Sequence, residues 1–408
     1  MQESASRITG KSFNLLTLAL AVMLVMSLWF SASAVVPQLV MQYDLSSATS
    51  AWLTMGVQLG FVVGALASAM LNLPDRFDTR KVFFISSVLA ALFNAAIPLF
   101  ETSAVMTIVL RILTGAMLAG VYPPGMKIMA TWCKSDVGFG IGLLVGALTV
   151  GTAMPHLLNA VPGFSGMPPW QDVMLSASLL ALIGALASLA IKSGPFLGSS
   201  APFNWRYMFT AFAHKPTRLA NYGYLGHMWE LYAMWAWVPL FLIASFEVAG
   251  LPVVNARLAG FATIAVGGIG ALLAGSLADR FGRTTITIWS LAISGACCLI
   301  AGPLFAYPML LTVLCLVWGF AVVADSAQFS AAITELTDPR YVGTALTLQT
   351  SLGFLLTMVS IQVIHWLQGY VGWRGVFAVL ALGPVFGIVS MWRLRQLPEA
   401  LQLAGGKR

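Results

Sequence analysis

Charged residues are scarce in this chain. They make up 9% of its 408 residues, whereas an ordinary soluble domain carries about 25%. No charge occurs from Ser12 to Tyr43, and none occurs from Thr284 to Ala324. Each run exceeds the roughly 20 apolar residues that a membrane-spanning helix needs. We therefore expect an all-α integral membrane protein that crosses the membrane several times.

The residue patterns of metal sites, redox centres and common enzyme sites are also absent from the sequence. The four cysteines have neither metal-ligand nor C-x-x-C spacing. No glycine-rich phosphate loop, metal cluster or catalytic triad stands out. We therefore expect neither an enzyme nor a cofactor.

Twelve apolar segments are long enough to span a membrane, six in each half of the chain. They lie near 13–37, 48–72, 82–100, 104–127, 138–161, 171–191, 219–244, 256–278, 285–302, 308–334, 342–367 and 375–392.

Lysine and arginine are distributed unevenly between the loops that join these spans. With both termini in the cytoplasm, 18 of the 21 basic residues fall on the cytoplasmic side. Arg257 and Arg374 fall outside, and Arg111 lies within a span. Because cytoplasmic loops are enriched in basic residues, this bias predicts cytoplasmic termini, in keeping with a bacterial inner membrane. The net charge of +7 then reflects topology and contact with anionic lipid, and no nucleic-acid partner is expected.

The two halves of the chain are related by an internal duplication. Leu73-Pro74-Asp75-Arg76-Phe77 recurs as Leu277-Ala278-Asp279-Arg280-Phe281, 204 residues later. Gly115 and Gly319 keep the same offset, and Trp170 and Trp373 nearly keep it. A duplicated half in so apolar a chain indicates a secondary transporter.

The second copy of the repeat, extended from Gly275 to Arg283, resembles the loop motif of the major facilitator superfamily. The first copy departs from that motif, with Asp78 and Thr79 at the places of Gly282 and Arg283. The resemblance covers the whole chain and implies twelve transmembrane helices in two pseudo-symmetric six-helix bundles. Within the family, the polar fourth span is similar to that of the branch of small-anion carriers of cyanate and nitrate type.

The same resemblance predicts a domain organisation around a central cavity. We expect an N-terminal bundle at 1–192, a cytoplasmic linker at 193–217, and a C-terminal bundle with a short cytoplasmic tail at 218–408. Since one chain completes such a cavity, it would work as a monomer.

The repeated loops are candidates for a gate at the cytoplasmic surface. Short acidic side chains flanked by arginine can pair with cations and cap neighbouring helices. The alternative is a charge cluster that only sets topology. The gate candidates are Asp75, Arg76, Asp279, Arg280 and Arg283.

Four ionisable residues inside spans have no counterpart in the other half. Arg111 is matched by Cys315, His227 by Met23, Glu230 by Met26, and Asp325 by Val121. An ionisable group within a span is costly, so its default interpretation is functional.

Each of these four residues has a candidate role. Glu230 and Asp325 are candidate proton carriers, and His227 shares a helix face with Glu230 and could form a relay with it. Arg111 is either a counter-ion for a carboxylate or a docking point for an anionic substrate. The alternative for Arg111 is that it bonds backbone carbonyls of span one and fixes helix packing.

Aromatic residues surround these positions. By the resemblance, spans one, four, seven and ten line the cavity, and Trp29, Tyr224 and Trp237 are the candidate lining residues. Aromatic walls with a few charges suit a partly apolar organic solute.

The sequence therefore predicts a proton-coupled secondary transporter of a small organic solute, with an anion among the candidates, working by alternating access. Its driving force would be a gradient of protons or of another ion. A drug or metabolite exporter driven by proton antiport is the main alternative. A membrane sensor that has lost transport is a more distant one.

Overall fold

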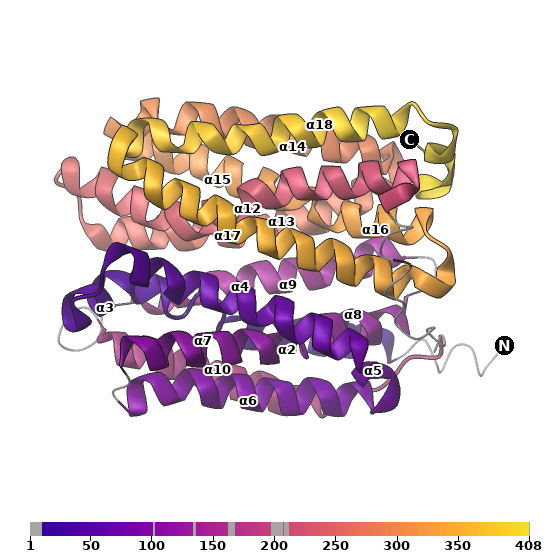
Figure 1. Cartoon of the computed structure of the whole chain (residues 1–408), viewed down its shortest axis with the longest axis horizontal. Coiled ribbons are helices and arrows are strands. Elements are labelled where there is room, and N and C mark those ends of the chain that lie inside the picture. Colours follow the sequence, from indigo (N-terminus) through magenta and orange to yellow (C-terminus); the bar gives the residue numbers. More distant parts are fainter. Residues whose placement is uncertain are drawn as a thin grey trace.

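The computed structural model describes residues 10–100, 103–133, 136–161, 168–196, 207 and 212–407, without the side chains at 47, 48, 74, 75 and 339. Within these residues the chain is helical and contains no strand. Figure 1 shows the first half of the sequence, in indigo to magenta, as one group of helices, and the second half, in salmon to yellow, as another.

The first half contains the helices up to residue 188. They are α2 (Lys11–Met26), η1 (Ser33–Val35), α3 (Val36–Tyr43), α4 (Ser47–Met70), α5 (Leu73–Arg76), α6 (Thr79–Leu99), α7 (Ala104–Leu118), α8 (Tyr122–Ala130), α9 (Val137–Leu158) and α10 (Trp170–Ser188).

The second half begins with a helix of 34 residues, α12. Its elements are α12 (Lys215–Val248), α13 (Val253–Phe281), α14 (Arg283–Ala301), η2 (Pro303–Ala306), α15 (Pro308–Ala324), α16 (Ser326–Leu336), η3 (Pro339–Tyr341), α17 (Val342–Gly375), η4 (Val376–Ala381), α18 (Leu382–Arg395) and η5 (Pro398–Gly406).

Ten helical segments of the described chain are long and apolar enough to cross a membrane. The last of them, Val342–Arg395, is 54 residues long and contains both α17 and α18. It counts as two spans, because the chain turns near the end of α17, at Gly372, where φ is 63°. The shorter apolar helix α2 continues through turns and η1 into α3. Counted in this way, the segments are the twelve spans of the predicted fold.

Several spans are broken near their middle, and the breaks follow the duplication. Span four breaks between α7 and α8, and span ten breaks at Asp325, between α15 and α16. Val121, in the first break, precedes Asp325 by 204 residues. Span seven, by contrast, is the continuous helix α12 of 34 residues. The break in span ten places the Asp325 side chain inside the protein.

The halves pack against each other mainly through two pairs of helices: α9 packs on α13, and α4 packs on α17. Small residues allow the first pair to come close. A Cβ at Gly146 would lie 3.0 Å from the carbonyl oxygen of Gly268, and a Cβ at Gly142 would lie 2.9 Å from that of Ala271. Close backbone contact of this kind is typical of helix pairs in membranes.

Within each half, one glycine of the duplicated fourth span touches the backbone of a neighbouring helix. A Cβ at Gly115 would collide with the carbonyl oxygen of Val57, and a Cβ at Gly319 would collide with that of Thr263. The duplication has therefore preserved the same close approach in both halves.

Alanine at Gly115 or at Gly319 should reduce the yield of folded protein sharply. The added methyl group meets backbone rather than a movable side chain, so the helices must separate, at a cost of about 1–3 kcal/mol or more. Gly369→Ala is the matched control, because a Cβ there meets nothing within 4 Å. Fluorescence-detected size-exclusion chromatography measures the yield. Equal yields for all three variants would contradict the packing argument.

The two copies of the loop motif turn in different ways. Gly282 has a φ of 96°, which favours glycine. At the equivalent place Asp78 has a φ of −56° and caps α6 by accepting from the backbone N–H of Arg80. The side-chain bonds from Arg80 lower the pKa of Asp78 below its ordinary value. The departure of the first copy from the motif is thus a different helix cap.

The predicted domain boundaries at 192 and 218 remain predictions. Much of the predicted linker 193–217 lies outside the described residues, and α12 already begins at Lys215. One end of the molecule carries α5, α16 and the C-terminus, and α3 lies at the other (Figure 1). We call these the tail end and the far end.

Candidate functional site

Glu230 lies on α12, fully buried in the interior of the second half. Its carboxylate accepts three hydrogen bonds. Ser294 donates to Oε2 at 2.9 Å, Cys298 donates to Oε1 at 3.2 Å, and the indole N–H of Trp318 donates to Oε1. All three donors are neutral, so no cation compensates the carboxylate among these partners.

The hydrogen-bond partners of Glu230 can accommodate both the ionised and the protonated form of its carboxyl group. Trp318 can only donate, so Oε1 must be the accepting oxygen. Ser294 also lies 3.3 Å from the carbonyl oxygen of Leu291 and can donate there instead. A proton on Oε2 can then be donated to the Ser294 hydroxyl. Both forms of Glu230 therefore keep their hydrogen bonds.

His227 pairs with Asp325 and not with Glu230. Its Nδ1 lies 2.9 Å from Asp325 Oδ1, and both side chains are 1% exposed. Sequence spacing had suggested a relay between His227 and Glu230, but the hydrogen bonds of Glu230 run to α14 and α15 instead. The break in span ten is what brings Asp325 to His227.

The His227 ring lies between two aromatic rings. Its centroid is 6.1 Å from that of Tyr224 and 5.5 Å from that of Phe329. Within the described residues, both ring nitrogens of His227 are buried without a hydrogen bond: Nδ1 lies only at ion-pair distance from Asp325, and Nε2 has no partner. A buried polar atom without a partner is costly, and a ligand or a water would satisfy it.

Arg111 is fully buried in the first half, where it is held by neutral acceptors. Its guanidinium donates to the carbonyl oxygens of Leu28, Trp29 and Leu53. It also donates to Ser31 Oγ at 2.9 Å and to Asn94 Oδ1 at 3.0 Å. These bonds tie α7 to the broken part of span one and leave no carboxylate among the partners. The arrangement is that of the packing alternative.

The buried charges of the two halves occupy related places. Asn94, which binds Arg111, and Cys298, which binds Glu230, are 204 residues apart. Each lies on the third span of its own half. The duplication has therefore produced two polar centres of opposite charge.

An aromatic cluster fills the space between the halves. It consists of Trp29, Phe30 and Phe61 from the first half, and Tyr232, Trp235 and Phe354 from the second. The ring centroid of Trp29 lies 5.2 Å from those of Phe61 and Phe354, and 5.7 Å from that of Tyr232. We call this set the interface cluster.

Polar atoms without partners occur in and beside the interface cluster. Among the described residues, the indole nitrogens of Trp29 and Trp235 are buried and have no hydrogen-bond partner, and neither atom of the Gln58 amide has one. Gln58 is one turn before Phe61 on α4. Neutral donors beside aromatic rings are what a partly apolar solute requires.

The other two candidate lining residues lie apart from this cluster. Trp237 donates its indole N–H to the carbonyl oxygen of Ile361 and stacks on His365, at 5.6 Å between centroids. Tyr224 packs beside His227, and a Cβ at Gly353 would collide with its ring. The structure therefore brings Trp29 to the meeting of the halves and Tyr224 to the His227 pair.

Comparison with known proteins identifies the family. The sequence profile of the Major Facilitator Superfamily matches residues 18–267 and 223–408, which together extend over most of the chain. The chain belongs to this superfamily.

Superfamily relatives with assigned names are transporters. The hexuronate transporter of Escherichia coli (strain K12) is 23% identical over 363 residues, which cover 81% of this chain and 82% of that protein. The 3-(3-hydroxy-phenyl)propionate transporter of the same organism is 31% identical over 139 residues, 34% of each chain. This superfamily member is therefore a small-solute transporter of the membrane and not an enzyme.

Solved structures of the superfamily share its fold. The proton:xylose symporter XylE, bound to 6-bromo-6-deoxy-D-glucose, aligns with a TM-score of 0.71 at 15% identity, covering 94% of this chain and 96% of that one. A bacterial homologue of the human lysosomal transporter Spinster, inward-facing and unoccupied, aligns with a TM-score of 0.65 at 17% identity, covering 94% and 95%. The predicted twelve-helix fold is thereby confirmed.

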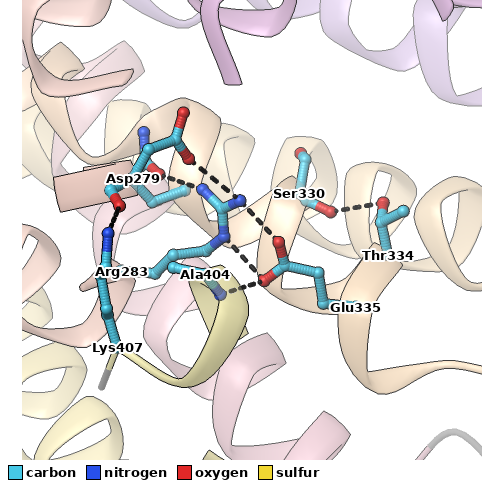
Figure 2. A network of polar contacts seen from close by, with 8 residues as sticks. Asp279, Arg283, Ser330, Thr334, Glu335, Ala404 and Lys407 are labelled. Carbon is cyan, nitrogen blue, oxygen red and sulfur yellow. Dashed lines mark hydrogen bonds and ion pairs between the residues drawn. The ribbon is translucent and has the colours of Figure 1, made fainter. Parts of the chain in front are cut away.

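The second loop motif of this superfamily member forms an ionic network at the tail end (Figure 2). Arg283 binds both carboxylate oxygens of Glu335, at 2.6 and 2.7 Å, and lies 3.5 Å from Asp279. It also donates to Gln328 at 2.9 Å. Glu335 and Gln328 carry no motif in the sequence, so only the structure reveals them.

Among the gate candidates whose side chains the structure describes, Arg280 and Arg76 make no contact with this network. Arg280 lies over the ring of Phe281, 5.2 Å from its centroid. Arg76 ends the short helix α5 and is exposed. The side chain of Asp75 lies outside the described part of the chain.

At the far end, a hydrogen bond links the two halves. Arg257 on α13 donates to the carbonyl oxygen of Asn159, at 2.8 Å, just beyond α9. The Asn159 side chain in turn donates to the carbonyl oxygen of Ala34, at 2.6 Å. The α9–α13 pair is thus held by polar contacts at the far end and by packed glycines along its length.

Proposed function

We propose that the chain is a proton-coupled carrier of a small organic acid that works by alternating access. The observation that carries the proposal is that Glu230 is fully buried among donors that are all neutral. The low dielectric of such a place disfavours a lone carboxylate, so a proton is the natural partner. Binding and release of that proton would then be linked to the transport cycle.

The chemistry of the donors favours a proton over a sodium ion. Trp318 and Cys298 direct hydrogens at Glu230, whereas a sodium ion is coordinated by oxygen atoms such as backbone carbonyls. Ser294 supplies the only oxygen among the three partners.

His227 and Asp325 form the proposed contact with the substrate. His227 Nδ1 lies at ion-pair distance from Asp325, and the partnerless Nε2 is left to bind a ligand. When protonated, His227 would donate from Nε2 to a carboxylate. Each of the three guanidinium nitrogens of Arg111 already donates to a neutral acceptor, so we do not assign this role to Arg111. The proton on His227 would thus supply the positive charge that Arg111 does not offer to the substrate carboxylate.

The wall of the site supports an organic acid with an apolar or aromatic body. The interface cluster offers ring faces, and Trp29, Trp235 and Gln58 offer polar atoms without partners. The names of both relatives denote organic acids, one a sugar acid and one an aromatic acid. In this proposal the tail end faces the cytoplasm of a bacterial inner membrane, in accord with the basic loops, and one chain is the working unit.

Uptake into liposomes tests the proposal. Purified protein would be reconstituted, and 3-(3-hydroxyphenyl)propionate and glucuronate would be offered with an acidic outside, with a sodium gradient, and with neither. We expect the acidic outside to drive accumulation of one of the two acids, and the sodium gradient to drive none. Accumulation that follows sodium would rule out proton coupling. Expulsion of solute toward the acidic side would identify the exporter alternative.

A further inference from the structure

The C-terminal segment after α18 is docked on the protein. Residues 398–407, which we call the strap, include η5 (Pro398–Gly406). Ala400 and Leu403 are fully buried, and Leu403 belongs to the main hydrophobic core. The strap is therefore anchored by apolar side chains before it reaches any charged group.

Three consecutive residues with positive φ turn the strap back on itself. They are Ala404 at 48°, Gly405 at 65° and Gly406 at 96°. At the start of this turn the backbone N–H of Ala404 donates to Glu335 Oε2 at 3.1 Å, and after it Lys407 Nζ donates to the carbonyl oxygen of Asp279 at 2.9 Å. Figure 2 shows both bonds beside Arg283.

Through these bonds the strap connects three helix ends. Glu335 ends the α16 region and is already held by Arg283, the first residue of α14. Asp279 lies in the last turn of α13, 3.5 Å from Arg283. A single short segment thus fixes the positions of α13, α14 and α16 at the tail end.

One member of this network also touches the other half. A Cβ at Gly138, in the first turn of α9, would lie 2.7 Å from Asp279 Oδ2. The Asp279 carboxylate therefore lies against a helix N-terminus, where its negative charge is stabilised. The strap holds the backbone of the residue that makes this contact between the halves.

The first half contains the same plan without the charges. Thr131 precedes Glu335 by 204 residues, and its hydroxyl accepts from the backbone N–H of Gly194 at 2.7 Å. In each half, then, a segment that follows the sixth span bonds to the end of the fourth. Thr79 stands at the place of Arg283, so this first-half contact lacks the ionic part.

We propose that the strap is a latch: it holds Asp279 against the start of α9 and so sets how readily the two halves separate at the tail end. This rests on the alternating-access part of the proposed function. Release of Lys407 frees the Asp279 backbone, weakens the contact of Asp279 with α9, and favours separation.

Hydrogen–deuterium exchange in detergent, without substrate, tests the latch. We compare the wild type, Lys407→Ala, a chain ended at Leu397, and Arg395→Ala as the matched control. Arg395 is a basic residue at the same end that bonds only Thr285 of α14 among the described contacts. We expect exchange in the first turns of α9 to be about two- to tenfold faster in Lys407→Ala and in the shortened chain, as for the loss of one hydrogen bond, and unchanged in Arg395→Ala.

The outcomes separate the latch from simple packing. Faster exchange confined to α14 and α16, with α9 unchanged, would overturn the proposal, because the strap would then stabilise only its own half. Since Lys407 is exposed, its alanine variant should fold even where the shortened chain does not. The measurement needs no substrate, so failure of the proposed transport function would leave its result intact.

Discussion

Glu230→Gln should lose pH-driven accumulation while it still exchanges substrate across the membrane. Glutamine cannot release a proton, but its amide fits the site: the oxygen accepts from Trp318, and the amide nitrogen donates to Ser294. At one proton per substrate, a pH difference of about one unit is worth about 1.4 kcal/mol, or about tenfold accumulation. We expect the wild type to approach that ratio in liposomes and the variant to stop at equal concentrations.

Glu247→Gln is the control for this variant. Glu247 lies near the end of the same helix and is exposed, so its neutralisation should leave both accumulation and exchange unchanged. Normal accumulation by Glu230→Gln would show that the proton is carried elsewhere, and the same measurement on Asp325→Asn would then decide. Loss of exchange together with accumulation would point instead to damage of the fold, which a thermal unfolding curve detects.

Most of the fold could be predicted from the sequence because its signals are long. The charge-free runs and the offset of 204 residues extend over whole spans, and lipid imposes a fixed length on each span. The breaks near Val121 and at Asp325 are different, because they depend on a single turn of backbone within an apolar run. The composition of the surrounding residues does not reveal such a break, although the break at Asp325 affects the direction of that side chain.

The sequence identifies the ionisable residues inside the spans, but it does not predict how they pair. Spacing along α12 places His227 and Glu230 near one face. Side chains three residues apart on a helix nevertheless point in somewhat different directions, so they can contact different neighbouring helices. His227 meets span ten at Asp325, while Glu230 meets α14 and α15. The packing of the whole bundle determines which helix lies on each side of α12. The sequence of α12 alone does not contain that information.

One pairing did leave a signal that residue-by-residue comparison of the halves can detect. Asn94 and Cys298 share the offset of the duplication, and each is a polar or polarisable residue on a third span. Each contacts the buried charge of its own half, Arg111 or Glu230. Searching the offset for matched polar positions, and not only for charges missing from one half, would have found both partners.

Arg111→Lys should fold poorly, and this is the second large effect that we expect. The guanidinium serves five acceptors around a planar fork, from Leu28, Trp29, Ser31, Leu53 and Asn94. A lysine ammonium has three donors at one point and cannot reach them together. Buried acceptors left without partners cost about 1–3 kcal/mol each. The expected result is a marked fall in folded yield and in the thermal midpoint.

Arg257→Lys is the matched comparison, because it makes the same substitution at a site whose hydrogen-bond geometry is simpler. Arg257 uses a single nitrogen to reach the carbonyl oxygen and side chain of Asn159, and lysine can do the same. We expect its folded yield to stay near that of the wild type. If Arg111→Lys folds equally well but requires more substrate for half-maximal uptake, Arg111 binds substrate directly. If it fails to fold while Arg257→Lys folds, the five neutral acceptors account for the presence of arginine at position 111, and a substrate need not be invoked for it.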